Sequence, residues 1–286
     1  MKLPAEQVRT KEVLDWKGVH LLHASLSSCS QKVRILLGEK GVDFLSRDVD
    51  LRTGAHMDAW FLGINPRGVV PVLVHDGDVH IESNHILQYI DEAFPTPEHS
   101  WMPKGEEQLA ITQKLLELEN NLHMDLRVVT MGYMVPQSLI KRGEEQLKNY
   151  EKNGADDPHR TREVAWWRAF AKHGITEKQS KDAVVAFHDA FVRLEELLGD
   201  RTWLLGDHPT VLDIAWFISI YRLIATGYPI DVHPSLERLY ERMHARPAFR
   251  KELAAGPAFA KVVMPVYSAL RRFRGTTLKE VYAQVY

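Results

Sequence analysis

The stretch HASLSSCSQKVRILLGEKG, residues 23–41, changes from apolar residues to a cluster of serines and then to a helical pattern. The apolar run Val19–Ala24 predicts a strand. From Ser30 to Gly41 the apolar residues recur on one helical face, and the glycine predicts the end of the helix. Serines at such a boundary are typical helix caps. The stretch therefore predicts either a cap alone or a cap that is also part of an active site.

The sequence that follows predicts a strand, a hairpin and a second helix. Residues 43–51, DFLSRDVDL, alternate loosely and predict a strand. Residues 70–81, VPVLVHDGDVHI, contain two apolar runs around an Asp-Gly turn, which is a strong hairpin signal. Ser83 predicts the cap of a helix over residues 84–94. This order of elements is typical of a small α/β domain.

These elements divide the chain into an arm, two domains and a linker. We expect a polar N-terminal arm over residues 1–17 and the α/β domain over residues 18–96. Three prolines in FPTPEHSWMPKG predict a linker, residues 97–105. Residues 106–286 have an almost wholly helical pattern. Within them, residues 141–181 are highly charged, and we expect the helices there to be solvated extensions.

Composition and charge exclude several classes of protein. The 286 residues carry 36 Lys and Arg against 38 Asp and Glu, without a basic run that would suit nucleic acid. One cysteine excludes an intrachain disulfide and a zinc site built from two cysteines of this chain, and we expect no metal. The longest apolar stretch, Ile214–Ala225, is shorter than the ~20 residues of a spanning helix. We expect a soluble cytoplasmic protein without membrane contact.

The segment KVVMPVYSALRRFR, residues 261–274, allows two interpretations. Its apolar and basic residues could form an amphipathic segment that touches a membrane or a partner. The alternative is a helix packed across the second domain, which is the one we expect.

Three motifs together resemble the cytosolic glutathione S-transferases, and the resemblance covers residues 19–250. SSCSQKVRILLGEKG is similar to the SSC motif of the zeta class, which includes maleylacetoacetate isomerases. Residues 63–95 resemble the glutathione-binding segment, and LLGDHPTVLDIA resembles the capping box of the second domain, here Thr210 and Asp213. The resemblance implies a thioredoxin-like α/β N-terminal domain, an all-α C-terminal domain and glutathione as co-substrate.

The charged region over residues 141–181 departs from the zeta and theta classes, which carry a shorter segment there. A similar enlargement occurs in ganglioside-induced differentiation-associated proteins and in bacterial members that cleave lignin-type aryl ethers. The class within the superfamily therefore stays open.

The resemblance implies a thiolate site at the serine cluster. Ser27 lies where the family places its catalytic serine or cysteine, and its hydroxyl would donate to the glutathione thiolate. Ser28 is the neighbouring candidate. Cys29 would lie beside the sulfur, and the alternative for it is a small buried residue. The alternative for Ser27 is a helix cap alone.

The resemblance also implies glutathione-binding residues. Pro71 would form a cis peptide bond that turns the Val70 backbone toward the tripeptide. Ser83 would bind the γ-glutamyl carboxylate and Glu82 its ammonium group. His56, with Arg67 as a weaker candidate, would meet the glycyl carboxylate.

An electrophile pocket is expected between the domains, with Met131, Tyr133 and Trp166 as its candidates and Tyr267 as a further one. The favoured function is a glutathione-dependent transferase that acts on an apolar, aromatic electrophile by conjugation or ether cleavage. A zeta-like isomerase is the first alternative, and a non-catalytic glutathione-binding or regulatory protein is the second. The resemblance implies a homodimer, or a heterodimer with a related chain.

Overall fold

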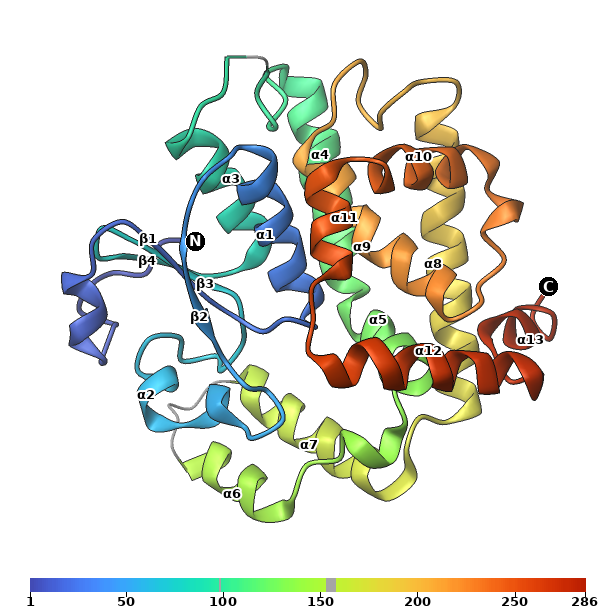
Figure 1. Ribbon diagram of the computed structural model, residues 1–286, viewed down its shortest axis with the longest axis horizontal. Coiled ribbons are helices and arrows are strands. Elements are labelled where there is room, and N and C mark those ends of the chain that lie inside the picture. Colours follow the sequence, from blue (N-terminus) through green and yellow to red (C-terminus); the bar gives the residue numbers. More distant parts are fainter. Residues whose placement is uncertain (98, 153–157) are drawn as a thin grey trace. The chain divides into compact units, whose positions relative to one another are not determined.

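The computed structural model in Figure 1 describes residues 1–97, 99–152 and 158–286. By their contacts, the residues form two compact units. The first unit comprises Met1–Ile90 and Ile140–Gly174, and the second comprises Asp91–Leu139 and Ile175–Tyr286. One has a four-stranded sheet with helices and the other is helical, so the expected α/β and all-α classes are confirmed. Residues 98 and 153–157 of the expected linker and charged region lie outside the described residues.

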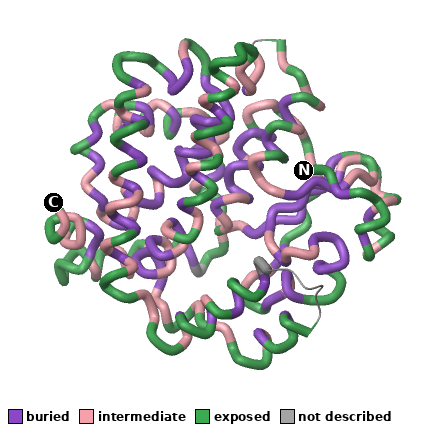
Figure 2. The backbone as a smooth tube through the Cα atoms, turned by 180° about the vertical axis from the view of Figure 1, so that it is seen from behind, coloured by how far each residue is buried: buried purple, intermediate pink, exposed green. Residues whose placement is uncertain are grey.

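The sheet of the first unit has the strand order β2-β1-β3-β4. Its strands are β1 (Val19–His23), β2 (Leu45–Asp48), β3 (Val72–His75) and β4 (Asp78–His80). Strand β1 pairs with β2 in parallel and with β3 antiparallel, and β3 pairs with β4 antiparallel. Every residue of β1 is buried, including His20 and His23, and the central strands are purple beside the N label in Figure 2.

The turn between β3 and β4 confirms the hairpin expected from the Asp-Gly pair. Asp76 and Gly77 have φ values of +50° and +86°. A Cβ added at Gly77 would lie 2.1 Å from the backbone oxygen of Leu14. The glycine is therefore required both by the backbone conformation and by the close approach of the chain.

The first unit also contains helices. They are η1 (Lys11–Asp15), α1 (Ser28–Glu39), η2 (Ala55–Met57), α2 (Ala59–Leu62), α3 (Ser83–Ala93), α6 (Glu144–Lys152) and α7 (Pro158–His173). We expected residues 1–17 to be a polar arm, but Leu3, Val8 and Val13 are buried in the core cluster that packs on the sheet. Apolar residues spaced among charged ones are sufficient to attach the segment.

We expected α6 and α7 to be solvated extensions, but both helices bury apolar side chains. Residues 140–174 group with the sheet-containing unit, whereas the sequence placed them in a domain over residues 106–286. Leu147 and Tyr150 of α6 are each 1% exposed, and Phe170 of α7 is 2% exposed. Three-residue spacing places such apolar residues on one helix face. Most charged residues of the two helices are exposed, whereas Arg160 and Glu163 of α7 are buried.

The second unit is built from helices. They are α4 (Glu106–Asn121), α5 (His123–Val129), the π-helical turn η3 (Thr130–Met134), η4 (Gln137–Leu139), α8 (Glu177–Leu198), α9 (Val211–Ala225), η5 (Ile230–Val232), α10 (Pro234–His244), α11 (Pro247–Ala254), α12 (Ala258–Phe273) and α13 (Leu278–Tyr282). The expected capping box opens α9: Thr210 donates its backbone N–H to Asp213 Oδ2 at 2.7 Å. Asp213 is fully buried, and burial raises the pKa of its carboxyl.

Helix α12 packs with one face on η3 of the same unit and exposes the other. Arg271 donates to the Gly132 carbonyl at 3.2 Å, whereas Val262, Val266 and Phe273 are exposed. Among the described residues, no helix has the length and apolar character needed to cross a membrane.

Candidate functional site

The sheet topology gathers three chain segments at one end of the sheet. Strands β1 and β3 pair antiparallel with Leu22 opposite Val72, and β4 runs antiparallel to β3. The chain therefore leaves β1 toward Ser27, enters β3 from Val70–Pro71 and leaves β4 toward Glu82–Ser83, all at the same end. Helices α1 and α3 both begin there and lie next to each other in Figure 1.

Ser27 is the N-cap of α1. Its Oγ accepts a hydrogen bond from the Ser30 backbone N–H at 3.2 Å, and the side chain is half-buried. A hydroxyl that accepts one bond still has its own O–H to donate. Ser28 and Cys29 are the first two residues of the helix, where Ser28 is buried and Cys29 is half-buried. The cap geometry thus leaves Ser27 able to donate to an anion at the helix N-terminus.

The loop before α1 is held by Arg34 and His23. Arg34 donates to His23 Nδ1 at 2.7 Å, to the Ala24 carbonyl at 3.1 Å and to the Ser25 carbonyl at 2.8 Å. A guanidinium only donates, so Nδ1 accepts and the imidazole proton lies on Nε2, which contacts Ser46 Oγ at 2.7 Å. Burial, and then the Arg34 charge, lower the pKa of His23 to about 4.

The neutral His23 predicts an acid-sensitive fold. Its folded pKa lies below its unfolded value of about 6.5, so its contribution is complete above that value and is lost as pH falls toward 4. Between pH 7 and pH 5, wild type should lose about 2 kcal/mol more unfolding free energy than His23→Asn, which keeps an acceptor for Arg34. Urea unfolding at both pH values measures the difference. Equal losses in the two proteins would contradict this account of the loop.

Glu82 and Ser83 lie where the chain passes from β4 into α3. Glu82 adopts φ +67°, a left-handed conformation that is uncommon for a non-glycine residue, and Ser83 is the first residue of α3 rather than its cap. Arg67 donates to Glu82 Oε1 at 2.6 Å. The Val70–Pro71 peptide bond is cis, as expected. The structure therefore brings Arg67 to Glu82, whereas the sequence grouped it with His56.

A buried lysine of α1 reaches the first turn of α3. Lys32 is 1% exposed, and its ammonium group donates to Asn84 Oδ1 at 3.2 Å. The sequence did not indicate this residue, because a lysine in a helix is usually solvated.

His56 lies in η2, on the segment that joins β2 to β3. Its side chain is buried, and its carbonyl lies 3.1 Å from the position of a Cβ added at Gly68. The backbone of His56 therefore packs closely against the backbone of Gly68, just before Val70. The imidazole belongs to the same unit as Ser27 and Ser83.

The pocket candidates come from different units. Met131 and Tyr133 lie in the π-helical turn of the second unit, where the Arg271 guanidinium stacks 4.3 Å from the centre of the Tyr133 ring. Arg271 also donates to Tyr267 Oη at 3.0 Å, so Tyr133 and Tyr267 share a neighbour. Trp166 lies in α7 of the first unit.

The N-terminal unit has the features of a site for an anionic ligand. Two helix N-termini favour negative charge, a half-buried hydroxyl can donate, and one carboxylate can accept from an ammonium group. These groups suit a zwitterionic molecule with several carboxylates better than an apolar one.

Comparisons with known proteins point in the same direction. Residues 26–93 match the family profile of the glutathione S-transferase N-terminal domain, and residues 159–251 match that of the C-terminal domain. Glutathione S-transferase 1 of Dianthus caryophyllus is 43% identical over 75% of this chain and 80% of its own. Maleylacetoacetate isomerase of Pseudomonas aeruginosa is 25% identical over 79% and 91%. The crystal structure of the β-etherase LigF from Sphingobium is similar in fold, with a TM-score of 0.70 and 24% identity over 82% and 98%.

Proposed function

Because the chain belongs to the glutathione S-transferase family, with glutathione as co-substrate, we propose that Ser27 stabilises the glutathione thiolate for attack on an electrophile. The observation that carries the proposal is the half-buried Ser27 hydroxyl at the α1 N-terminus, on the same end of the sheet as Glu82 and Ser83. A serine hydroxyl does not remove the thiol proton at neutral pH. It lowers the thiol pKa by donating to the anion, and the proton leaves to water.

We assign the rest of glutathione to the remaining groups at this end of the sheet. Ser83 and the α3 N-terminus bind the γ-glutamyl carboxylate, and Glu82, held by Arg67, binds the ammonium group. The Val70 backbone pairs with the peptide, and His56 faces the glycyl carboxylate. Ser28 and Cys29 complete the first turn around the sulfur.

The electrophile we propose is an aryl ether. The thiolate attacks the ether carbon, a C–S bond forms as the C–O bond breaks, and the phenolate that leaves takes up a proton. Met131, Tyr133 and Trp166 are the proposed apolar contacts. The fold similarity to a β-etherase and the aromatic residues of α7 and η3 support this reaction class.

Isomerisation is the second candidate, favoured by the serine-serine-cysteine sequence and by the similarity to a maleylacetoacetate isomerase. In that reaction the thiolate adds to a double bond, the resulting single bond rotates, and elimination returns the thiolate. Glutathione is then not consumed. A non-catalytic glutathione-binding or regulatory protein is the alternative of another class.

Product analysis distinguishes these functions. Calorimetry first measures glutathione binding, and the protein is then supplied with glutathione and either a β-aryl ether dimer or a maleyl substrate. Ether cleavage releases one phenol for each glutathione consumed, which is the expected result. Isomerisation without consumption favours the second candidate, and binding without turnover favours the non-catalytic one. An absence of binding would contradict the assignment of Val70, Glu82 and Ser83.

Dimerisation and a cytoplasmic location complete the proposal. Light scattering of the purified chain tests for a homodimer. A monomer that associates only with a related chain would favour the heterodimer.

A further inference from the structure

Helices α6 and α7 attach to the segment that joins β2 to β3. Helix α6 contacts η2, which contains His56. Side chains of the helix pair and of the residues just before it donate to four backbone carbonyls of residues 52–67. These bonds are Arg142 Nη1 to Arg52 at 3.2 Å, Gln146 Nε2 to Thr53 at 3.0 Å, Arg160 Nη2 to Pro66 at 2.6 Å and Tyr150 Oη to Arg67 at 2.8 Å.

Tyr150 is at the centre of this contact. It is 1% exposed, and the guanidinium of Arg160, itself 4% exposed, lies 5.0 Å from the centre of its ring. A Cβ added at Gly68 would lie 2.8 Å from Tyr150 Cε2 and 2.9 Å from its hydroxyl oxygen. Gly68 has φ +64°, so the glycine allows both the turn and the seating of the tyrosine ring.

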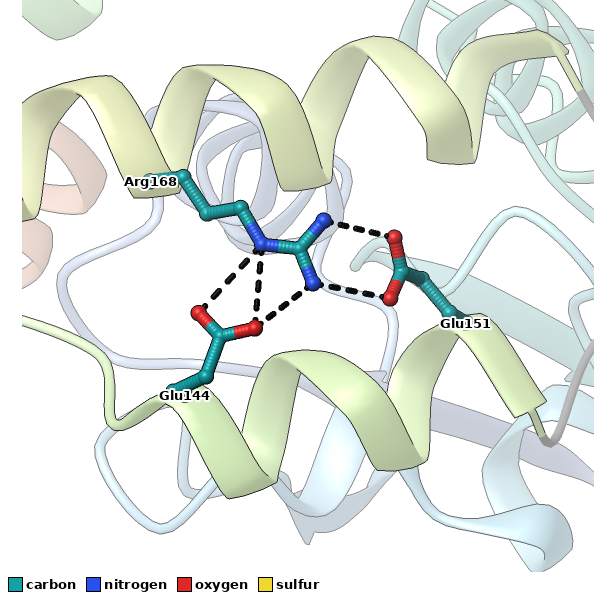
Figure 3. Close-up of polar contacts among 3 residues, drawn as sticks. All are labelled: Glu144, Glu151 and Arg168. Atoms are coloured by element: carbon teal, nitrogen blue, oxygen red, sulfur yellow. Dashed lines mark hydrogen bonds and ion pairs between the residues drawn. The ribbon is translucent and has the colours of Figure 1, made fainter.

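The two helices are fastened to each other on their outer side. Figure 3 shows Arg168 of α7 between Glu144 and Glu151 of α6, with contacts of 2.7 Å and 2.8 Å. Arg168 makes two hydrogen bonds to Glu151 and also contacts both oxygens of Glu144. A single exposed ion pair contributes little to stability, but a guanidinium shared by two carboxylates fixes the position of α7 relative to α6.

The segment between β2 and β3 has little regular structure of its own. Between Asp48 and Val72 it contains only η2, of three residues, and α2, of four, in the described residues. If such a segment becomes ordered only when the ligand binds, the entropy cost of ordering it weakens the affinity. Contacts that order the segment beforehand remove this cost. The donors from α6 and α7 bond to backbone carbonyls of this segment. They therefore fix its backbone conformation and leave its side chains able to bind a ligand.

We propose that α6 and α7 form a clamp that sets the affinity for the glycyl end of glutathione by fixing residues 52–68, with Tyr150 and Arg160 as positioning residues. The proposal rests on the proposed function, because it takes His56 as the group that faces the glycyl carboxylate. The clamp acts on glutathione binding and not on the thiolate, since Ser27 belongs to a different segment.

Tyr150→Phe tests the proposal, because it removes one hydrogen bond and keeps the ring. The Kd and KM for glutathione should rise about fivefold, the effect of one buried hydrogen bond, while kcat at saturation and the pKa of the bound thiol stay the same. The Kd for γ-glutamylcysteine, which lacks the glycine, should rise clearly less, because only the Arg67 contact with Glu82 links the clamp to that part of the ligand. Hydrogen exchange of the amides of residues 52–68 should become faster. The matched control is Tyr89→Phe on α3, which loses a 2.7 Å bond to His75 of β3 and should leave both ligands unaffected.

Each part of the proposal can fail separately. An unchanged glutathione Kd in both Tyr150→Phe and Arg160→Met, with the fold intact by circular dichroism, would overturn the clamp. An equal loss for both ligands would overturn its assignment to the glycyl end. A wild-type protein that binds no glutathione would overturn the proposed function. In that case, faster hydrogen exchange of the amides of residues 52–68 in Tyr150→Phe would still support the contact between the clamp and this segment.

Discussion

Ser27→Ala is expected to lower kcat for glutathione transfer about a hundredfold, with a much smaller change in the KM for glutathione. The hydroxyl donates to a charge that is fully present only on the reacting sulfur, so its removal raises the barrier more than it weakens binding. Loss of one such donor typically costs about 2.7–4 kcal/mol, which is 10²- to 10³-fold in rate. Steady-state kinetics with saturating electrophile measure the effect.

The cap role of Ser27 has to be separated from its role at the sulfur. Its Oγ accepts from the Ser30 N–H, so the alanine variant also loses about 1 kcal/mol of stability. Ser27→Asp keeps an acceptor for the cap but places a carboxylate beside the thiolate. We expect Ser27→Asp to be as stable as wild type and as inactive as Ser27→Ala. Ser25→Ala is the control and should keep wild-type activity. Full activity in Ser27→Ala would leave the serine as a cap alone.

Glu82→Gly is expected to weaken glutathione binding about 10- to 100-fold while the free energy of unfolding changes by less than about 1 kcal/mol. The carboxylate is proposed to bind the γ-glutamyl ammonium group, and hydrogen bonds to charged groups contribute about 1.5–3 kcal/mol. Glycine relieves the left-handed conformation at φ +67°, which offsets the loss of the half-exposed pair with Arg67. Calorimetry and urea unfolding of the same preparations measure the two effects.

Asp76→Gly is the matched control for this prediction. Asp76 also has a positive φ, +50°, but it lies in the β3–β4 turn at the opposite end of the hairpin from Glu82. The control should bind glutathione as wild type does. A loss of affinity in both variants would mean that backbone freedom in the hairpin, and not the Glu82 carboxylate, sets the affinity.

Local signals predicted the parts of the fold that short stretches determine. The Asp76-Gly77 turn, the cap at Ser27 and the capping box at Asp213 each depend on neighbours within a few residues. The same is true of the apolar run that forms β1. Because such features depend on residues that are close in sequence, a single sequence was sufficient to predict them. The cap at Ser27 is the one that belongs to the candidate site.

The remaining parts depend on contacts between residues that are distant in sequence. Tyr150 is buried because it packs on Gly68, 82 positions earlier, and Lys32 is buried beside Asn84 of another helix. Neither pairing leaves a periodic signal. The charges on α6 and α7 made these helices resemble solvated ones, and only their contacts group them with the first unit. The proposed electrophile contacts are harder still to predict, because no short motif marks Tyr133 or Trp166.

Thiol activation is the central claim, and the ultraviolet thiolate absorbance of bound glutathione across a pH series tests it most directly. An unperturbed thiol titrates near a pKa of about 8.5. We predict that glutathione bound to the wild-type protein titrates at least about one pH unit lower, and that the shift disappears in Ser27→Ala. A bound thiol that titrates like the unbound one in both proteins would contradict the account.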